Sequence, residues 1–301
     1  LSFSSLIIFL YICVMCVAPA VAFATGGATL STLTGLPYLL CTLIIGIFIF
    51  IVAIFGTDLV RKVASVLSIC IIVGLLIVYV PNIITGASAI KETATIMINN
   101  HLPFGKALYS AFLYGTFQLA NVAVFVQHAK SFDKPKDAVK SMGIGCVINA
   151  IMMTIVVLGI MTVASKPEMA EQSVPTLFMV KNGVGSRFMT PLISILIILG
   201  AVSTAVNMVA AMVTRISSSI DKGTKKSAGT GINSDRPSDS IKSDIFSKIT
   251  FKEVIIAILC CLADFGIAQF GLLTLIQKAY SFLAYLAIPV ILIPYLIHMI
   301  V

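Results

Sequence analysis

Charged residues are scarce in this chain of 301 residues. Asp, Glu, Lys and Arg together make up 11% of it, whereas soluble domains carry roughly 25%. Apolar residues reach 59% and the mean hydropathy is +1.08, so a water-soluble globular domain is excluded. The composition predicts an all-α polytopic membrane protein, with residues 1–301 forming a single transmembrane domain.

Sequence motifs of enzymes and metal sites are also lacking. The chain contains neither an HExxH zinc-protease motif nor a GxSxG nucleophile elbow, and Asp264 has no second carboxylate in its apolar run for a catalytic dyad. The seven cysteines all lie in apolar runs, so they predict neither a disulfide framework nor a zinc site. We therefore expect no enzymatic activity, and no cofactor other than a coupling cation, Na⁺ or H⁺.

A signal peptide is missing as well. The first apolar run begins at the first residue, without the basic segment and the small-residue cleavage site of a signal peptide, so we expect a truncated amino terminus. The net charge of +8 does not indicate a nucleic-acid partner, because the basic residues are scattered among several loops. Their distribution instead reports the orientation of the chain in the membrane.

Apolar runs of about 20 residues, the length of a membrane-spanning helix, occur eight times. Most Lys and Arg residues follow the second, fourth and sixth runs, which places those loops and both chain ends in the cytoplasm. The polar, Ser- and Gly-rich stretch 218–249 predicts a disordered cytoplasmic loop, and the apolar stretch 174–180 predicts a short outer helix or gate. The eight spans are expected near 3–24, 37–56, 63–85, 107–129, 138–164, 188–214, 251–270 and 272–300.

Polar side chains interrupt the fourth run on one helical face. They recur at spacings of three and four residues from Ser110 onward, and lipid does not tolerate such a face cheaply. Gly115 lies within this stripe and predicts a break in the helix, where freed backbone groups bind a solute. The candidate substrate-binding residues are Tyr114, Gly115, Gln118 and Asn121, with Tyr11 as a weaker candidate for the same cavity.

A second polar stripe lies in the sixth run, where Gly200, Ser203, Thr204 and Asn207 share one face. Two neighbouring hydroxyl groups and free carbonyls one turn earlier would form an oxygen site suited to a small cation. The alternative is that these small residues only let helices approach closely. The candidate cation-binding residues are Gly200, Ser203 and Thr204.

Asp264 is the one carboxylate that lies clearly within an apolar run. An ionisable group at membrane depth indicates a functional site by default, here a proton-coupling site. The alternative is a hydrated carboxylate at the membrane interface, because the seventh run ends shortly after it.

Three stretches of the sequence resemble a known family: "YGTFQLANVAVFVQHAKSFDKPKDAVKSMGIG", "STAVNMV" and "FGIAQFGLLTLIQKAYSFLAYLAIPV". Together they resemble the YkvI-like bacterial membrane proteins, which belong to the amino acid, polyamine and cation transporter superfamily with the LeuT-type fold. The resemblance implies ten core helices in two inverted five-helix repeats, of which the eight runs would be the third to the tenth. The run 107–129 would be the discontinuous sixth helix, although Phe117 and Gln118 stand where the family has a Tyr-Asn pair.

The resemblance also implies a function. Ser203 and Thr204 fall where sodium-coupled relatives bind a cation on the eighth helix. We therefore expect a cation-coupled secondary transporter of a small, amino-acid-like solute in the bacterial cytoplasmic membrane, with the solute and the bilayer as its partners. The alternatives are a non-transporting receptor or sensor, a channel, or an inactive truncated remnant, and the sequence does not determine the substrate, the coupling ion or the oligomeric state.

Overall fold

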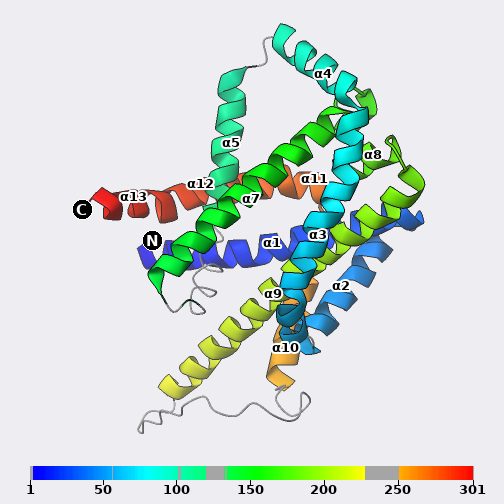
Figure 1. The fold of residues 1–301 in the computed structure, drawn as a ribbon. Coiled ribbons are helices and arrows are strands. Elements are labelled where there is room, and N and C mark those ends of the chain that lie inside the picture. The colour runs from blue at the N-terminus through cyan, green and yellow to red at the C-terminus, as the bar shows by residue number, and fades with distance from the viewer. Residues whose placement is uncertain are drawn as a thin grey trace.

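The computed structural model describes residues 3–55, 57–100, 103–119, 132, 134–227 and 251–300, with side chains at 16–54, 66–100, 103–119, 132, 134–213, 216–217 and 251–298. Helices fill almost all of these ranges, and no strand occurs in them (Figure 1). The predicted all-α class is thereby confirmed. The α-helices are α1 (Phe3–Thr34), α2 (Tyr38–Phe55), α3 (Thr57–Thr85), α4 (Ala87–Asn99), α5 (Phe104–Leu119), α7 (Pro135–Met161), α8 (Pro175–Lys181), α9 (Ser186–Ser227), α10 (Phe251–Ala268), α11 (Leu272–Thr274), α12 (Tyr280–Ala287) and α13 (Ile293–Ile300).

Five helical segments are long and apolar enough to cross a membrane, which confirms a membrane-embedded protein. By length and composition the described residues do not reach the expected eight spans. The described part of α5 has 16 residues, the apolar segment Tyr38–Ile54 of α2 is also shorter than the five spans, and α10 includes two charged residues in its first turn and Asp264 further on. The five segments are Cys16–Thr34, Val66–Thr85, Pro135–Met161, Ser186–Val213 and Leu272–His298.

The predicted boundaries differ most from the structure at α1 and α9. α1 continues to Thr34, because its glycines 26 and 27 do not end the helix but lie against side chains of α2. α9 continues to Ser227, so the first part of the segment predicted to be disordered is helical, and the rest of that segment lies outside the described residues. The short helix predicted over 174–180 is confirmed as α8.

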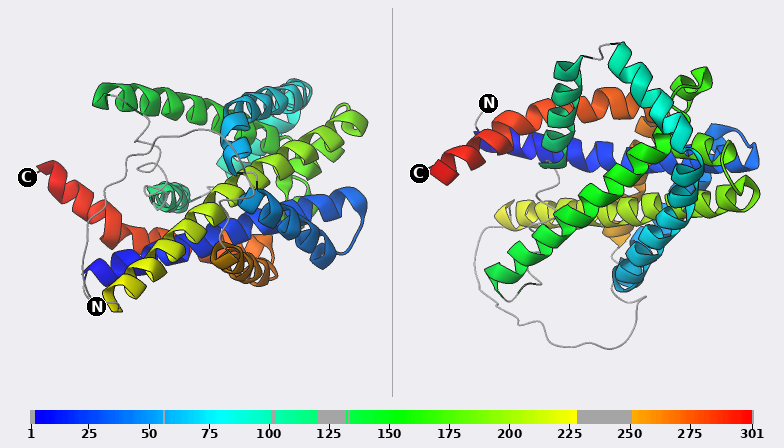
Figure 2. Two further views of the ribbon diagram at one scale, coloured as in Figure 1. Left: turned by 90° about the horizontal axis from the view of Figure 1, so that it is seen from below. Right: turned by 45° about the horizontal axis from the view of Figure 1, so that its top comes forward.

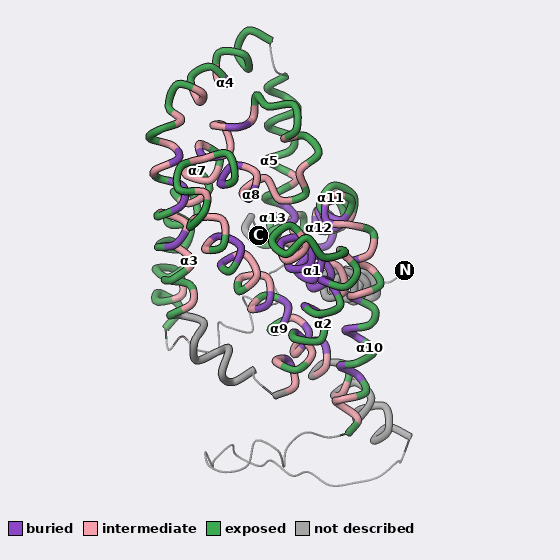
Figure 3. Tube along the Cα trace, turned by 90° about the vertical axis from the view of Figure 1, so that its right-hand side faces the viewer, coloured by how far each residue is buried: buried purple, intermediate pink, exposed green. Residues whose placement is uncertain are grey.

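The main apolar core forms where α1 packs against α2, α9 and α10. Ala20, Phe23 and Ala24 of α1 are completely buried, and Figure 3 shows buried residues concentrated along α1. α9 crosses α1 along its central part (Figures 1 and 2). Small side chains let the backbones of these helices approach closely, which is the main source of packing energy between helices in lipid.

A second contact joins α5 to the α11–α13 region. The rings of Phe117 in α5 and Tyr280 in α12 are stacked with their centroids 4.0 Å apart. Further along the same two helices, the hydroxyl groups of Tyr109 and Tyr285 are hydrogen-bonded at 2.6 Å. α12 is bounded by two segments of π-helix, Leu275–Ala279 and Ile288–Leu292, a geometry that is frequent at functional sites.

A third apolar cluster holds α8 against α3 and α9. The hydroxyl groups of Tyr79 in α3 and Thr176 in α8 are hydrogen-bonded at 2.7 Å. Asn82 Oδ1 accepts a hydrogen bond of 3.0 Å from the backbone N–H of Val184, just before α9. Both α3 residues are buried, so partly buried hydrogen bonds from α3 hold α8 and the turn before α9 in addition to the apolar packing.

α7 has little protein around it. Figure 3 shows it exposed along most of its length, and its exposed side chains include the apolar Val139, Ile144, Val147 and Ile151. Apolar side chains on the outside are expected where lipid is the solvent.

The contact between α1 and α2 predicts a glycine-specific stability effect. A Cβ atom at Gly27 would stand 2.9 Å from the backbone Cα of Thr42, so the two helices would have to separate. We expect Gly27→Ala to destabilise the fold by about 1–3 kcal/mol, seen as a lower thermal unfolding midpoint in detergent.

The matched control is Gly143→Ala in α7, where a Cβ atom would meet nothing within 4 Å. This change should leave the midpoint unchanged or raise it, because alanine favours helix by up to about 1 kcal/mol over glycine. Equal midpoints for both variants would contradict the close packing of α1 on α2.

Candidate functional site

The polar stripe of α5 faces a cavity of about 350 Å³ that is also lined by the Leu275–Ala279 segment and α12. Ser110 and Tyr114 supply its polar wall on the α5 side, and Gln277 and Ser281 lie opposite. Gln118 is exposed and does not line this cavity. Two further predicted substrate-binding positions, Asn121 and the side chain of Tyr11, lie outside the described residues.

The helix break predicted at Gly115 is wrong. α5 runs without interruption from Phe104 to Leu119, and the hydroxyl of Thr116 donates a 2.8 Å hydrogen bond to the carbonyl oxygen of Phe112. A glycine inside a helix costs only about 1 kcal/mol relative to alanine, which the remaining helix tolerates. The backbone at Gly115 is therefore helical. The hydroxyl of Thr116 gives a carbonyl oxygen of this turn an additional hydrogen bond.

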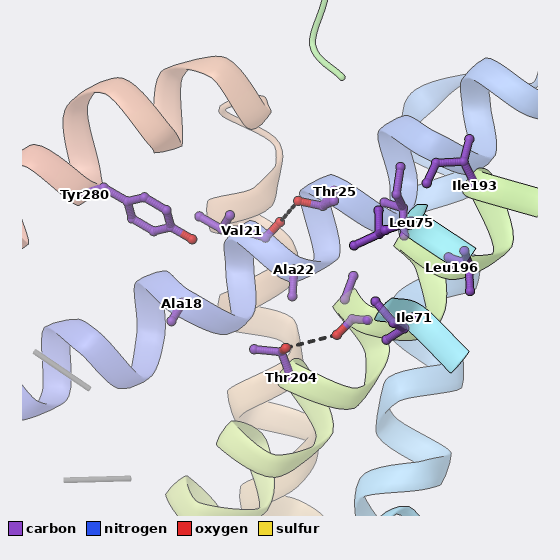
Figure 4. Close-up of a pocket in the computed structure, with 13 residues that line it drawn as sticks. Ala18, Val21, Ala22, Thr25, Ile71, Leu75, Ile193, Leu196, Thr204 and Tyr280 are labelled. Atoms are coloured by element: carbon purple, nitrogen blue, oxygen red, sulfur yellow. Dashed lines mark hydrogen bonds between the residues drawn. The ribbon is translucent and has the colours of Figure 1, made fainter. Parts of the chain in front are cut away.

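A second cavity, also of about 350 Å³, lies between α1, α3 and α9 (Figure 4). Its walls are mostly aliphatic side chains, and its polar side chains are Thr25 of α1, Thr204 of α9 and Tyr280 of α12. Ala18 and Ala22 of α1 face it with side chains too short to fill it. Small residues let α1 pack closely on its other neighbours. At this place the small residues Ala18 and Ala22 leave a gap, which is the cavity.

The predicted cation-binding residues are only partly brought together. Gly200 and Thr204 line the second cavity, whereas Ser203 does not, because adjacent helical residues point about 100° apart. The carbonyl oxygen of Gly200 accepts a 2.9 Å hydrogen bond from the Thr204 hydroxyl, and that of Ser203 accepts one of 2.9 Å from Asn207. α9 is unbroken, so the free carbonyls that the sequence suggested are not present at this turn.

Asp264 is fully buried in α10, with 0% of its surface exposed. Both of its carboxylate oxygens are buried without a hydrogen-bond partner among the described residues. The described residues therefore shield this side chain from solvent. Asp264 lines neither of the two cavities. Asp264 is buried because α10 packs on α1, α2 and α9.

Tyr280 is the residue that sequence reasoning missed. It lines both cavities, and its ring is fixed against Phe117 of α5. In the sequence it stands in "LIQKAYSFLAYL", where no spacing distinguishes it from the neighbouring Tyr285. Only the contact of α12 with α5 on one side and α1 on the other gives it this position.

Comparison with known proteins assigns the chain to no family and no function. No family model, curated protein or solved structure matches the chain significantly.

The unpartnered carboxylate predicts an unusual response to substitution. Asp264→Asn keeps the shape of the side chain but removes the charge that burial makes costly. Above neutral pH, where the Asp264 carboxyl group would otherwise ionise, we expect this variant to raise the stability of the fold by about 1–3 kcal/mol, measured as a higher thermal midpoint at alkaline pH.

Asp137→Asn is the matched control, because Asp137 is exposed in the first turn of α7. Its negative charge favours that helix end by about 0.3–1 kcal/mol, so the control should lower the midpoint slightly. A lower midpoint for Asp264→Asn would mean that the buried carboxylate stabilises the fold through a partner.

Proposed function

We propose that this protein is a cation-coupled secondary transporter of a small, amino-acid-like solute in a bacterial cytoplasmic membrane. The observation that carries the proposal is the pair of cavities that meet at Tyr280. Each has about 350 Å³, within the usual range for ligand sites of roughly 300–1,000 Å³. The first cavity is lined by Ser110 and Tyr114 of the polar stripe in α5. The second cavity is lined by Gly200 and Thr204 of the polar stripe in α9.

The helix packing supports a LeuT-type arrangement with eight of its helices. If the apolar runs are the third to the tenth core helices, α1 and α9 are the third helices of the two repeats, and α2 and α10 are the fourth. Repeats related by a pseudo-two-fold axis bring equivalent helices to equivalent places. The packing of these four helices around one apolar core agrees with that relation, and so does the YkvI-like resemblance of the sequence.

Two cation sites are consistent with the proposal. Asp264 is the better candidate, because a fully buried carboxylate without a partner can take up and release a proton as its surroundings change. A Na⁺ site at Ser203 and Thr204 is the second candidate. It requires α9 to rearrange at Gly200, because the carbonyl of Gly200 already accepts the Thr204 hydroxyl.

A receptor or sensor would bind the solute without moving it, and a channel would pass solute without saturation. The mostly aliphatic walls of the second cavity favour a binding site over a continuous aqueous pore. The transport assay below separates these alternatives from a carrier.

We expect the full chain in liposomes to accumulate radiolabelled L-leucine when a proton gradient, acidic outside, is imposed. Asp264→Asn should reduce this accumulation to the level of empty liposomes, because the variant cannot exchange a proton at that position. Ser203→Ala combined with Thr204→Ala should leave proton-driven uptake in place, and Asp137→Asn should behave as the unchanged protein.

Loss of a sodium-driven uptake in the Ser203 and Thr204 double variant, with Asp264→Asn unaffected, would instead assign the coupling to Na⁺. Uptake that neither gradient drives above that of empty liposomes would contradict the carrier function.

A further inference from the structure

A third cavity, of about 200 Å³, is a groove between α2 and α10. The two helices contact each other, and both pack on α1 (Figure 1). Each of them contributes one helical face to the groove, and α1 contributes a single aromatic ring. The lining residues are Leu43, Gly46, Ile47 and Phe50 of α2, Ile258, Cys261, Leu262 and Phe265 of α10, and Phe23 of α1.

The lining of this groove is apolar throughout. Apart from the thiol of Cys261, its side chains are hydrocarbon, and no charged or hydroxyl-bearing side chain is among the described residues that line it. A polar solute would lose its hydration there without gaining hydrogen bonds. The groove therefore selects a hydrocarbon ligand.

The groove is closed toward the core and open toward the bilayer. At its bottom, Phe23 is completely buried and takes the space that a side chain at Gly46 would need. A Cβ atom at Gly46 would stand 2.8 Å from Cε1 of the Phe23 ring. The rim is exposed, and exposed apolar surface of a membrane-embedded helix faces lipid. The exposed residues of the rim are Leu43, Ile47, Ile258 and Leu262.

The dimensions of the groove fit a segment of one hydrocarbon chain. Its lining runs from residue 43 to 50 on α2 and from 258 to 265 on α10, a helical rise of about 10 Å. That length lies within one leaflet of a hydrocarbon core about 30 Å thick. The volume of about 200 Å³ is below the roughly 300–1,000 Å³ of pockets that enclose a whole ligand.

A transmembrane helix of a partner fits this groove less well than a hydrocarbon chain does. Helices associate in lipid through small side chains that let their backbones approach. The rim of the groove instead carries Leu and Ile side chains, and aromatic rings stand at Phe50 and Phe265. A thin, flexible chain can follow such an uneven wall and gain dispersion contacts along it.

We propose that the groove between α2 and α10 is a lipid-binding site that holds one acyl chain of a phospholipid in preference to the surrounding detergent or lipid. The bound chain contacts both helices and so supports their packing on α1, a helix that also lines the second cavity. This site goes beyond the proposed transport function and does not depend on it.

The chain contains no tryptophan, so one introduced indole reports on a single position. Ile47→Trp places it at the rim of the groove, and Val147→Trp, on the exposed surface of α7, is the matched control outside the groove. The full chain in detergent is titrated with phosphatidylglycerol that carries brominated acyl chains, which quench a nearby indole. We expect half-maximal quenching of Ile47→Trp at a lipid fraction about fivefold lower than that of Val147→Trp, because many small dispersion contacts add up.

A second pair of variants tests whether the groove itself holds the lipid. Ile258→Trp puts an indole into the groove, whereas Ile255→Trp puts one on the exposed surface of the same helix outside it. Native mass spectrometry of the full chain, purified from membranes, should show a retained phospholipid on the unchanged protein and on Ile255→Trp. Ile258→Trp should lose most of this retained phospholipid.

Several results would overturn the proposal. Equal half-maximal lipid fractions for Ile47→Trp and Val147→Trp would mean that ordinary exchanging lipid covers the groove. Full retention in Ile258→Trp would place the retained phospholipid elsewhere on the protein. A prenyl quinone retained in place of phospholipid, or a dimer that Ile258→Trp dissociates, would assign the groove to another occupant. These readouts involve no uptake into liposomes, so the lipid site and the transport function stand or fall separately.

Discussion

The close packing of α1 on its neighbours is the interaction on which the rest of the structure depends. Lipid offers no hydrophobic drive for helices to associate, so contact must come from shape and from small side chains that let backbones approach. α1 supplies both, with Ala20, Phe23 and Ala24 completely buried and with Gly27 against the backbone of α2. α2, α9 and α10 are held in one core by this helix.

The same packing creates the candidate site. Where Ala18 and Ala22 face α3 and α9, no side chain is long enough to fill the space, and the second cavity results. α12 closes that cavity with Tyr280 and simultaneously packs on α5, which connects the second cavity to the first through a single aromatic residue. The π-helical segments on both sides of α12 loosen the regular backbone pattern next to this residue. Buried Asp264 lies on α10, which packs on α1 and α9, two of the helices that line the second cavity.

The sequence predicts the class of the protein well, because composition and run length respond directly to the lipid environment. The helical runs and the short helix α8 were accessible from hydropathy, and Asp264 stood out because carboxylates are rare in apolar segments. Local spacing was less informative about detail. It grouped Ser203 with Thr204, although only Thr204 reaches the cavity, and it suggested a break at Gly115 where α5 is continuous. Helical periodicity identifies a face, but it does not identify what that face meets.

Tyr280 illustrates what sequence patterns cannot supply. Its position between the two cavities depends on contacts with α5 and α1, which are far away in the chain, and its hydroxyl group makes no hydrogen bond within the described part of the chain. Nothing in the residues next to Tyr280 records either condition. The distinction between Tyr280 and Tyr285, five residues apart on the same helical segment, is a property of the tertiary packing alone.

Counterflow tests the central claim of a carrier most directly. Liposomes that contain the full chain are loaded with unlabelled L-leucine and diluted into a trace of labelled L-leucine, without any ion gradient. A carrier that alternates between two sides exchanges the two pools, so we predict a transient accumulation of label above its equilibrium level that empty liposomes do not give. A monotonic approach to equilibrium would indicate a channel, and no entry above empty liposomes would indicate a protein that does not transport this solute; either result would contradict the account.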